Sequence, residues 1–481
     1  MPTAPSASSG FATQPAAIAG MPPGIPYIVG NEAAERFSFY GMKTILVVFM
    51  TQFLHSTAGG PDFMTDAESR EWMHLFVASA YFFPVVGGIL ADAFLGKYLT
   101  ILLLSLVYCV GHLCLAAMDM PAPFLEATFA PRGWLLAGLA LIAIGSGGIK
   151  PCVSAHVGDQ FGRSNSHLLE RVFGWFYFAI NFGSFFSTLL TPWLLEHRGP
   201  GVAFGVPGVL MGIATFVFWA GRHRFIHVPP RGARYFAETF GPEGLAAIAR
   251  LVPLFLLVAV FWSLYDQTGG AWVQQAEWMN RRFLGHEWLP SQIQAINPLL
   301  VLAFIPLSGG VLYPLAERIV RLTPLRKILA GFALTVGAFA ISATAQGLID
   351  AESARLAAAG LGPEAARWPS IGWQLAAYVV ITAAEILVSI TCLEFSYTQA
   401  PPQMKSLVMS LYLLSVSLGN LFTAVVNAVT KDASGESALT GASYYWFFAG
   451  CMAVATVLLV PVVWSYRPRE YLQAEADSTP A

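Results

Sequence analysis

The chain has 481 residues, of which 56% are hydrophobic and only 11% are charged, and its mean hydropathy is +0.60. Soluble proteins carry about 25% charged residues, so this composition excludes an ordinary soluble domain and indicates a polytopic membrane protein in a lipid bilayer. The net charge of -2 leaves no basic surface for nucleic acid. The functional information therefore lies in where the few charges sit.

The first 26 residues have the composition of a flexible segment. Residues 1–26 are rich in Pro, Ala, Ser and Gly and contain no Lys or Arg. Because they lack the basic segment that begins a cleaved signal peptide, a flexible cytoplasmic tail is expected.

Twelve apolar segments follow, each long enough for the roughly 20 residues that a membrane-spanning helix needs. They lie at 27–54, 72–92, 99–118, 133–157, 171–196, 203–221, 250–275, 292–316, 325–347, 371–399, 405–430 and 443–466. Residues 222–249 are too short and too polar for further spans. The sequence predicts an all-α polytopic membrane protein with twelve transmembrane helices in two six-helix bundles, at 27–221 and 250–466, with a linker at 222–249 and a tail at 467–481.

Lysine and arginine are distributed unequally between the two sides of these spans. One side gathers 15 of them outside the span interiors and the other gathers eight. The positive-inside rule therefore places both termini and the linker in the cytoplasm of a multi-pass protein of the cell membrane. The five cysteines have no paired spacing, which predicts no disulfide framework, no metal site and no cofactor.

The first span carries four charges, at Glu32, Glu35, Arg36 and Lys43. Positions 32, 36 and 43 fall on one face of a helix. Ionisable groups inside a membrane are costly and mark a proton, ion or substrate path by default. The alternative is a purely structural ion-pair network that locks this helix to its neighbours.

The second half contributes two isolated acids, Asp266 and Glu385. Lys43 and Asp266 each lie sixteen residues beyond the expected start of their spans, so at about 1.5 Å per residue they reach equal depth and can pair across the two halves. The first half contributes the cations Arg36, Lys43 and Lys150. These cations would face the two acids of the second half, which matches the two ends of a zwitterion such as a free peptide. For Lys150 the alternative is a lysine that snorkels to the interface.

Several segments resemble one transporter family. Residues Glu32 to Gly41, with Glu35, Arg36, Phe37, Phe39 and Tyr40, resemble the ExxERFxYYG signature of proton-coupled oligopeptide transporters, a branch of the major facilitator superfamily. Further matches run from Gly87-Gly-Ile-Leu-Ala-Asp92 through Gly145-Ser-Gly-Gly-Ile-Lys150-Pro151 and Phe176-Tyr177-Phe-Ala-Ile-Asn181-Phe-Gly183 to Glu394-Phe-Ser-Tyr397-Thr-Gln-Ala-Pro401. The resemblance implies the major facilitator fold and a symporter that imports di- and tripeptides with protons by alternating access.

The resemblance also implies roles for individual residues. Arg36, Lys43 and Lys150 would hold the peptide carboxylate and Glu385 its amino terminus. The other binding residues would be Asn181 and Asn297 for the peptide backbone, and Tyr40, Tyr81 and Trp262 for side chains. Proton coupling would fall to Glu32, Glu35, Arg36, His74 and Asp266.

Some positions depart from common bacterial members. The seventh span has Tyr265-Asp266 where these usually carry paired glutamates, and Cys152 replaces a usual Asn. Asp266, the Glu394 segment and His74 look closer to animal peptide transporters. His74 is either a proton relay or a satisfied interfacial histidine, and Glu394 either couples to transport or only reaches nearby backbone.

Other classes of function fit less well. An intramembrane enzyme would need a buried nucleophile with a base or paired metal ligands, and His74, His112 and His156 sit on different spans without such spacing. The alternative within transport is a family relative that carries another small solute, such as nitrate, histidine or a peptide-like compound. A monomer is expected.

Overall fold

The structure is a computed structural model that describes residues 11–15, 17–118, 130–162, 164–399, 405–431 and 437–466. Residues 1–10 of the expected first tail, the expected second tail at 467–481 and Pro401 of the Glu394 segment lie outside the described residues.

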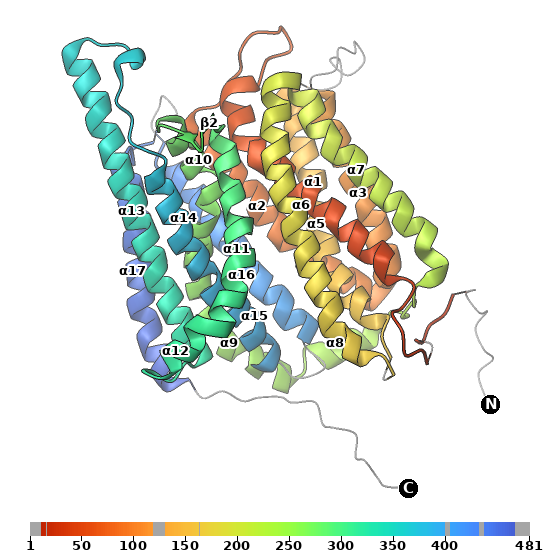
Figure 1. Cartoon of the computed structure of the whole chain (residues 1–481). Coiled ribbons are helices and arrows are strands. Elements are labelled where there is room, and N and C mark those ends of the chain that lie inside the picture. Colours follow the sequence, from red (N-terminus) through yellow and green to blue (C-terminus); the bar gives the residue numbers. More distant parts are fainter. Residues whose placement is uncertain are drawn as a thin grey trace, which may run out of the picture.

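The first half of the chain forms six long helices (Figure 1). These are α1 (Ile25–Val48), α2 (Asp66–Ile89), α3 (Lys97–Ala117), α5 (Pro131–Asp159), α6 (Leu169–Arg198) and α7 (Pro200–Ala220). Wider π-helical turns extend α1 through Phe49–Phe53 and α2 through Leu90–Leu95. The short helix α8 (Ala233–Thr239) lies in the linker.

The second half forms six further spans, several of which are broken into shorter helices. The first four are α9 (Pro242–Tyr265) with α10 (Ala271–Glu277), α11 (Ile296–Leu307) with α12 (Tyr313–Glu317), α13 (Pro324–Ala359), and α14 (Gly372–Glu385) with α15 (Thr391–Gln399). The last two are α16 (Lys405–Val429) and α17 (Ala442–Ser465). A small antiparallel hairpin, β1 (Arg282–Phe283) with β2 (His286–Glu287), connects α10 to the next span.

These elements agree with the twelve expected spans. Eleven described helices are long and apolar enough to cross a membrane. The twelfth, α1, has 24 residues but carries the charges of Glu32, Glu35, Arg36 and Lys43, which lower its hydropathy. The largest differences from the expected bounds are that α9 begins at Pro242 and that α13 runs on to Ala359. The extension of α13 is held by Arg355, whose guanidinium donates to Glu352 at 2.7 and 2.8 Å.

The two halves have separate hydrophobic cores. One core is built from buried residues between Ile25 and Phe225, and the other from buried residues between Leu251 and Leu459. In Figure 1 the red-to-yellow helices of the first half gather on one side, and the green-to-blue helices of the second half on the other. Two bundles therefore pack side by side, as the resemblance to the major facilitator superfamily implies.

The long axis of the molecule has two distinguishable ends (Figure 1). The β hairpin and the last turns of α13 lie at one end, here called the hairpin end. The helices α8 and α12 lie at the other, here called the linker end. The bundles meet chiefly where α2 packs along α16, and again where α6 meets α11.

Candidate functional site

The charged signature of α1 forms a buried cluster. Arg36 Nε lies 2.6 Å from Glu32 Oε1 and 3.2 Å from Glu35 Oε2. Both carboxylates are 1% exposed. Ser146 of α5 donates its hydroxyl to Glu35 Oε1 at 2.6 Å. One guanidinium thus contacts two acids but can balance the charge of only one, so protonation of either acid would change the charge balance of this cluster.

Asn181 on α6 lies near this cluster but is engaged within its own helix. Gly183 lies so close to α1 that an added Cβ would be 2.6 Å from the Ala33 carbonyl oxygen and 3.5 Å from Arg36 Cβ. Asn181 itself is 7% exposed and donates to the Tyr177 carbonyl at 3.0 Å. Its expected hydrogen bond to a peptide backbone stays a prediction.

Close contact between α2 and α5 positions Lys150. An added Cβ on Gly87 would lie 2.2 Å from the Gly148 carbonyl oxygen, so only glycine permits this approach. Two residues further along α5, the Lys150 ammonium lies 3.9 Å from the ring centroid of Phe39 and 4.2 Å from that of Tyr81. Its Nζ is buried and has no hydrogen-bond partner among the described residues.

The acidic side of the site lies in the second bundle, around Glu385 at the end of α14. Asn297 of α11 donates its amide to Glu385 Oε2 at 2.9 Å and to Thr382 Oγ1 at 3.0 Å, and accepts from the Tyr265 hydroxyl at 3.3 Å. No Lys or Arg nitrogen of the described residues lies within 4.0 Å of Glu385. Amide and hydroxyl groups therefore hold this carboxylate without neutralising it.

A chain of polar contacts crosses between the bundles nearer the hairpin end. The expected pairing of Lys43 with Asp266 is confirmed, with Nζ 2.7 Å from Oδ1. Asn420 of α16 donates to the other Asp266 oxygen, Oδ2, at 2.7 Å. The Asn420 Oδ1 atom lies 2.7 Å from His74 Nδ1 on α2. His74 is therefore a buried member of this network rather than an interfacial residue.

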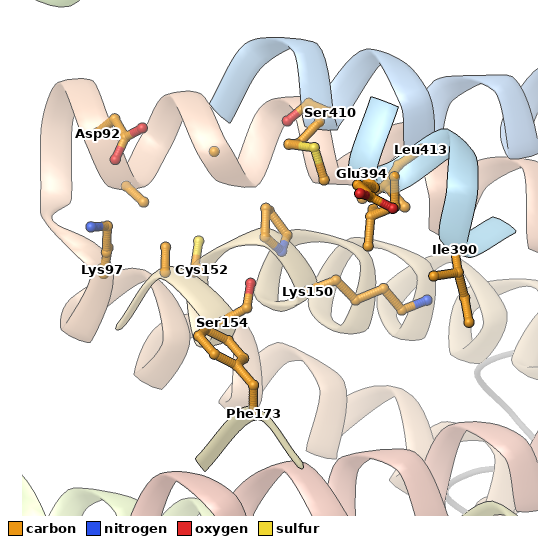
Figure 2. Close-up of a pocket in the computed structure, with 16 residues that line it drawn as sticks. Asp92, Lys97, Lys150, Cys152, Ser154, Phe173, Ile390, Glu394, Ser410 and Leu413 are labelled. Atoms are coloured by element: carbon orange, nitrogen blue, oxygen red, sulfur yellow. The ribbon is translucent and has the colours of Figure 1, made fainter. Parts of the chain in front are cut away.

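A cavity of about 620 Å³ lies between the bundles on the linker side of these clusters. Figure 2 shows Asp92 and Lys97 towards one end of it and Lys150 and Ile390 towards the other. Glu394 of α15 also lines the cavity. Lys97 pairs with Asp159 at 2.7 Å, so it is already neutralised. Most of the wall is apolar, which suits varied side chains.

The remaining predicted binding residues lie in aromatic packing. Tyr40 packs edge to face on Phe39, with centroids 5.6 Å apart. Trp262 is 9% exposed and packs on Tyr265, with centroids 5.3 Å apart. Of the nine residues predicted to bind substrate, Lys150 lines the cavity, while the others lie in the clusters and packing described above.

Sequence reasoning missed three partners that the structure brings to the site. Ser146 binds Glu35, Asn420 links Asp266 to His74, and Thr382 helps to hold Asn297. Only Asn420 had a usable signal, because Asn420 and Asn427 are seven residues apart on one face of an apolar span. Among the described residues, no group of three or more His, Cys, Asp or Glu side chains is placed to hold a metal ion.

Comparison with known proteins gives a consistent result. The family model described as PTR2, the POT family, matches residues 98–242 and 242–447. Peptide transporter family 1 of Drosophila melanogaster is 36% identical over 67% of this chain and 47% of its own length, and human Solute carrier family 15 member 2 is 37% identical over 68% and 49%. The chain thus spans about half the length of the curated relatives it matches.

Solved structures agree over nearly the whole chain. The crystal structure of the POT family transporter PepTSo superposes with a TM-score of 0.80 at 36% identity, covering 93% of this chain and 98% of that one. An auto-inhibited POT family peptide transporter superposes equally well at 34% identity, covering 94% and 99%. The protein therefore belongs to the POT family of membrane transporters and has its major facilitator fold.

Proposed function

We propose that this protein is a proton-coupled symporter that imports di- and tripeptides by alternating access between its two bundles. One observation carries the proposal: Lys150 in the first bundle and Glu385 in the second have no ion-pair partner within 4.0 Å in the described part of the chain. A buried charge without a counter-ion is costly. A zwitterionic peptide supplies a carboxylate for the lysine and an ammonium for the glutamate.

The other two cations of the site already have partners. Arg36 is bound to Glu32 and Glu35, and Lys43 to Asp266. We infer that Lys150 makes the direct contact with the peptide carboxylate. Arg36 and Lys43 attract it more weakly until one of their acids is protonated.

Proton coupling is proposed to use the same acids. A proton on Glu32, Glu35 or Asp266 removes one charge of an ion pair in a low-dielectric interior. At Glu32 or Glu35 this changes the charge carried by α1, and at Asp266 it weakens the contact between α1 and the second bundle. The relation of His74 to Asp266 through Asn420 supports a part for His74 in this step. Because the relatives are transporters, we infer transport rather than catalysis.

The orientation and assembly are also proposals. The excess of Lys and Arg on one side supports a cell-membrane protein with both termini and the 222–249 linker in the cytoplasm, so that the cavity opens inward. A monomer suffices, because the site lies within one chain. A cysteine placed at Arg231 should react with an impermeant thiol reagent only after the cells are opened. Labelling of intact cells would reverse the topology.

Purified protein in liposomes tests the function. Dialanine and trialanine should accumulate when an inward proton gradient or a negative-inside potential is imposed, and a protonophore should abolish the accumulation. Competition with nitrate, histidine and free alanine separates the alternatives. Accumulation of nitrate or histidine without accumulation of dialanine or trialanine would replace the peptide with another small solute.

A further inference from the structure

The ammonium of Lys150 lies against two aromatic rings instead of an acid. Phe39 of α1 and Tyr81 of α2 present their faces to Nζ at 3.9 and 4.2 Å from the ring centroids. Lys150 lines the 620 Å³ cavity, yet its Nζ is buried and donates to no hydrogen-bond partner among the described residues. Lys150 therefore borders the cavity while its ammonium packs against the two rings.

The nearest acids explain why the rings hold this charge. Glu32 and Glu35 are both bound by Arg36, and Glu35 also accepts from Ser146. A cation over the face of an aromatic ring is stabilised by the negative charge of that face, most strongly where water is excluded. Two rings can therefore keep Lys150 charged without a carboxylate.

We propose that Phe39 and Tyr81 form an aromatic cage that competes with the substrate carboxylate for the Lys150 ammonium, and so favours release into the cavity at the linker end. This inference rests on the proposed function, because it takes the carboxylate to be that of a peptide. Phe39 and Tyr81 are positioning residues in this account. They act on the substrate through Lys150.

The conformation of the molecule supports a role in release. Lys43 pairs with Asp266 across the bundles nearer the hairpin end, whereas the cavity lies on the linker side. In this state the cation that would bind the carboxylate is withdrawn against the rings. A peptide can bind here only if Lys150 leaves the cage, so the strength of the cage subtracts from peptide affinity.

The cage makes an unusual prediction, because weakening it should tighten binding. Phe39 is replaced by phenylalanine carrying one, two or three ring fluorines, which draw negative charge from the ring face and change its size little. Affinity of the purified protein for dialanine is then measured by calorimetry. We expect affinity to rise with each fluorine, by roughly tenfold at the third, while the maximal uptake rate in liposomes falls.

Three controls separate this effect from a general disturbance of the core. Dialanine amide lacks the carboxylate, so its affinity should not change along the series. The same fluorines at Phe76, which packs on Phe39 with centroids 5.9 Å apart, should have no effect on dialanine. Among ordinary substitutions, Phe39→Leu and Tyr81→Leu each remove one aromatic face and should bind dialanine more tightly than Phe39→Tyr and Tyr81→Phe, which keep that face.

The outcomes are decisive in each direction. Affinity that stays constant or falls along the fluorine series would overturn the cage, and so would an equal change for dialanine and its amide. If the wild-type protein binds neither dialanine nor trialanine, the proposed function fails instead. The two failures are therefore distinguishable.

Discussion

The charged residues of this site fall into three groups according to their ion-pair partners. Arg36 contacts two acids on its own helix, Lys43 pairs with Asp266 across the bundles, and Lys150 and Glu385 have no ion-pair partner among the described residues. Paired groups can respond to protons because protonation removes one partner. Unpaired groups can respond to a charged substrate. In the proposed function, this division would separate proton coupling from substrate binding within one small region.

Neutralising the acids of α1 should separate these two functions. In Glu32→Gln or Glu35→Gln, gradient-driven uptake of dialanine should be lost, because the substituted side chain can no longer take up a proton beside Arg36. Exchange of labelled for unlabelled dialanine should persist, since exchange moves no net protons. Glu68→Gln is the control, because Glu68 pairs with Arg132 at 2.8 Å outside the α1 cluster and should support normal uptake. Full gradient-driven uptake by both α1 variants would assign these acids a structural role.

Glu385 should act on binding itself. In Glu385→Gln, the ammonium of the peptide loses a charged acceptor, which should weaken dialanine binding by about 1.5 to 3 kcal/mol. Calorimetry on the purified variant measures this directly. Glu394→Gln is the matched control, because Glu394 lines the cavity and is exposed. If the Glu385 variant binds dialanine as tightly as wild type, the amino-terminus site lies elsewhere.

At the scale of elements, glycine contacts decide how closely α2 and α5 approach. Gly87 faces the backbone of Gly148, and an added Cβ on Gly147 would lie 2.5 Å from the Ala80 carbonyl oxygen. This approach brings Lys150 of α5 to the ring of Tyr81 on α2. The glycine-rich run before Lys150 therefore builds the site through packing.

A side chain at Gly87 should force these helices apart. Gly87→Val should destabilise the protein by about 1 to 3 kcal/mol, as overpacking of a tight contact does, and should lower its thermal midpoint in detergent. Gly212→Val on α7 is the control, because nothing lies within 4 Å of an added Cβ there. Equal thermal midpoints for both variants would mean that the close approach contributes little to stability.

The sequence predicts single elements of this site better than contacts between elements. The sequence predicts that Glu32 and Arg36 lie on the same face because both residues belong to one helix with fixed spacing. Equal depth also predicts the contact of Lys43 with Asp266. By contrast, Ser146 and Asn420 are ordinary polar residues whose partners depend on how the bundles pack. The end of α13 at Ala359 was missed because the helix continues beyond the apolar segment that marks the membrane.

At the scale of the whole molecule, the two bundles are joined unevenly. Along α2 and α16, Lys431 pairs with Glu71, Arg70 donates to Asn427 at 3.0 Å, and Ser417 donates to the Ala78 carbonyl at 2.7 Å. The contact of His74 with Asn420 lies between the contacts of Glu71 and Ala78 along α2. At the other junction, α6 and α11 meet through fewer residues. Rocking of the bundles is therefore expected to pivot along α2 and α16.

Closure of the hairpin end should depend on the pair of Lys43 with Asp266. In Asp266→Asn, the lysine loses its charged partner and Asn420 loses a charged acceptor, so states open at this end should become more populated. Spin labels at His55 and Arg282, both exposed at the hairpin end, report the distance between bundles in a background without native cysteines. We expect a larger fraction of long distances.

Exchange of the two charges tests whether the pair itself provides the closure. Lys43→Asp combined with Asp266→Lys keeps both charges across the same gap, so it should restore part of the short-distance population that Lys43→Asp alone removes. If Asp266 acted only through helix packing, the double exchange would not restore the short-distance population, because it preserves the two charges but not the shapes of the side chains. A distance distribution that is the same in wild type and Asp266→Asn at every pH would show that the pair is not a gate, and Asp266 would then act through His74 and Asn420 alone.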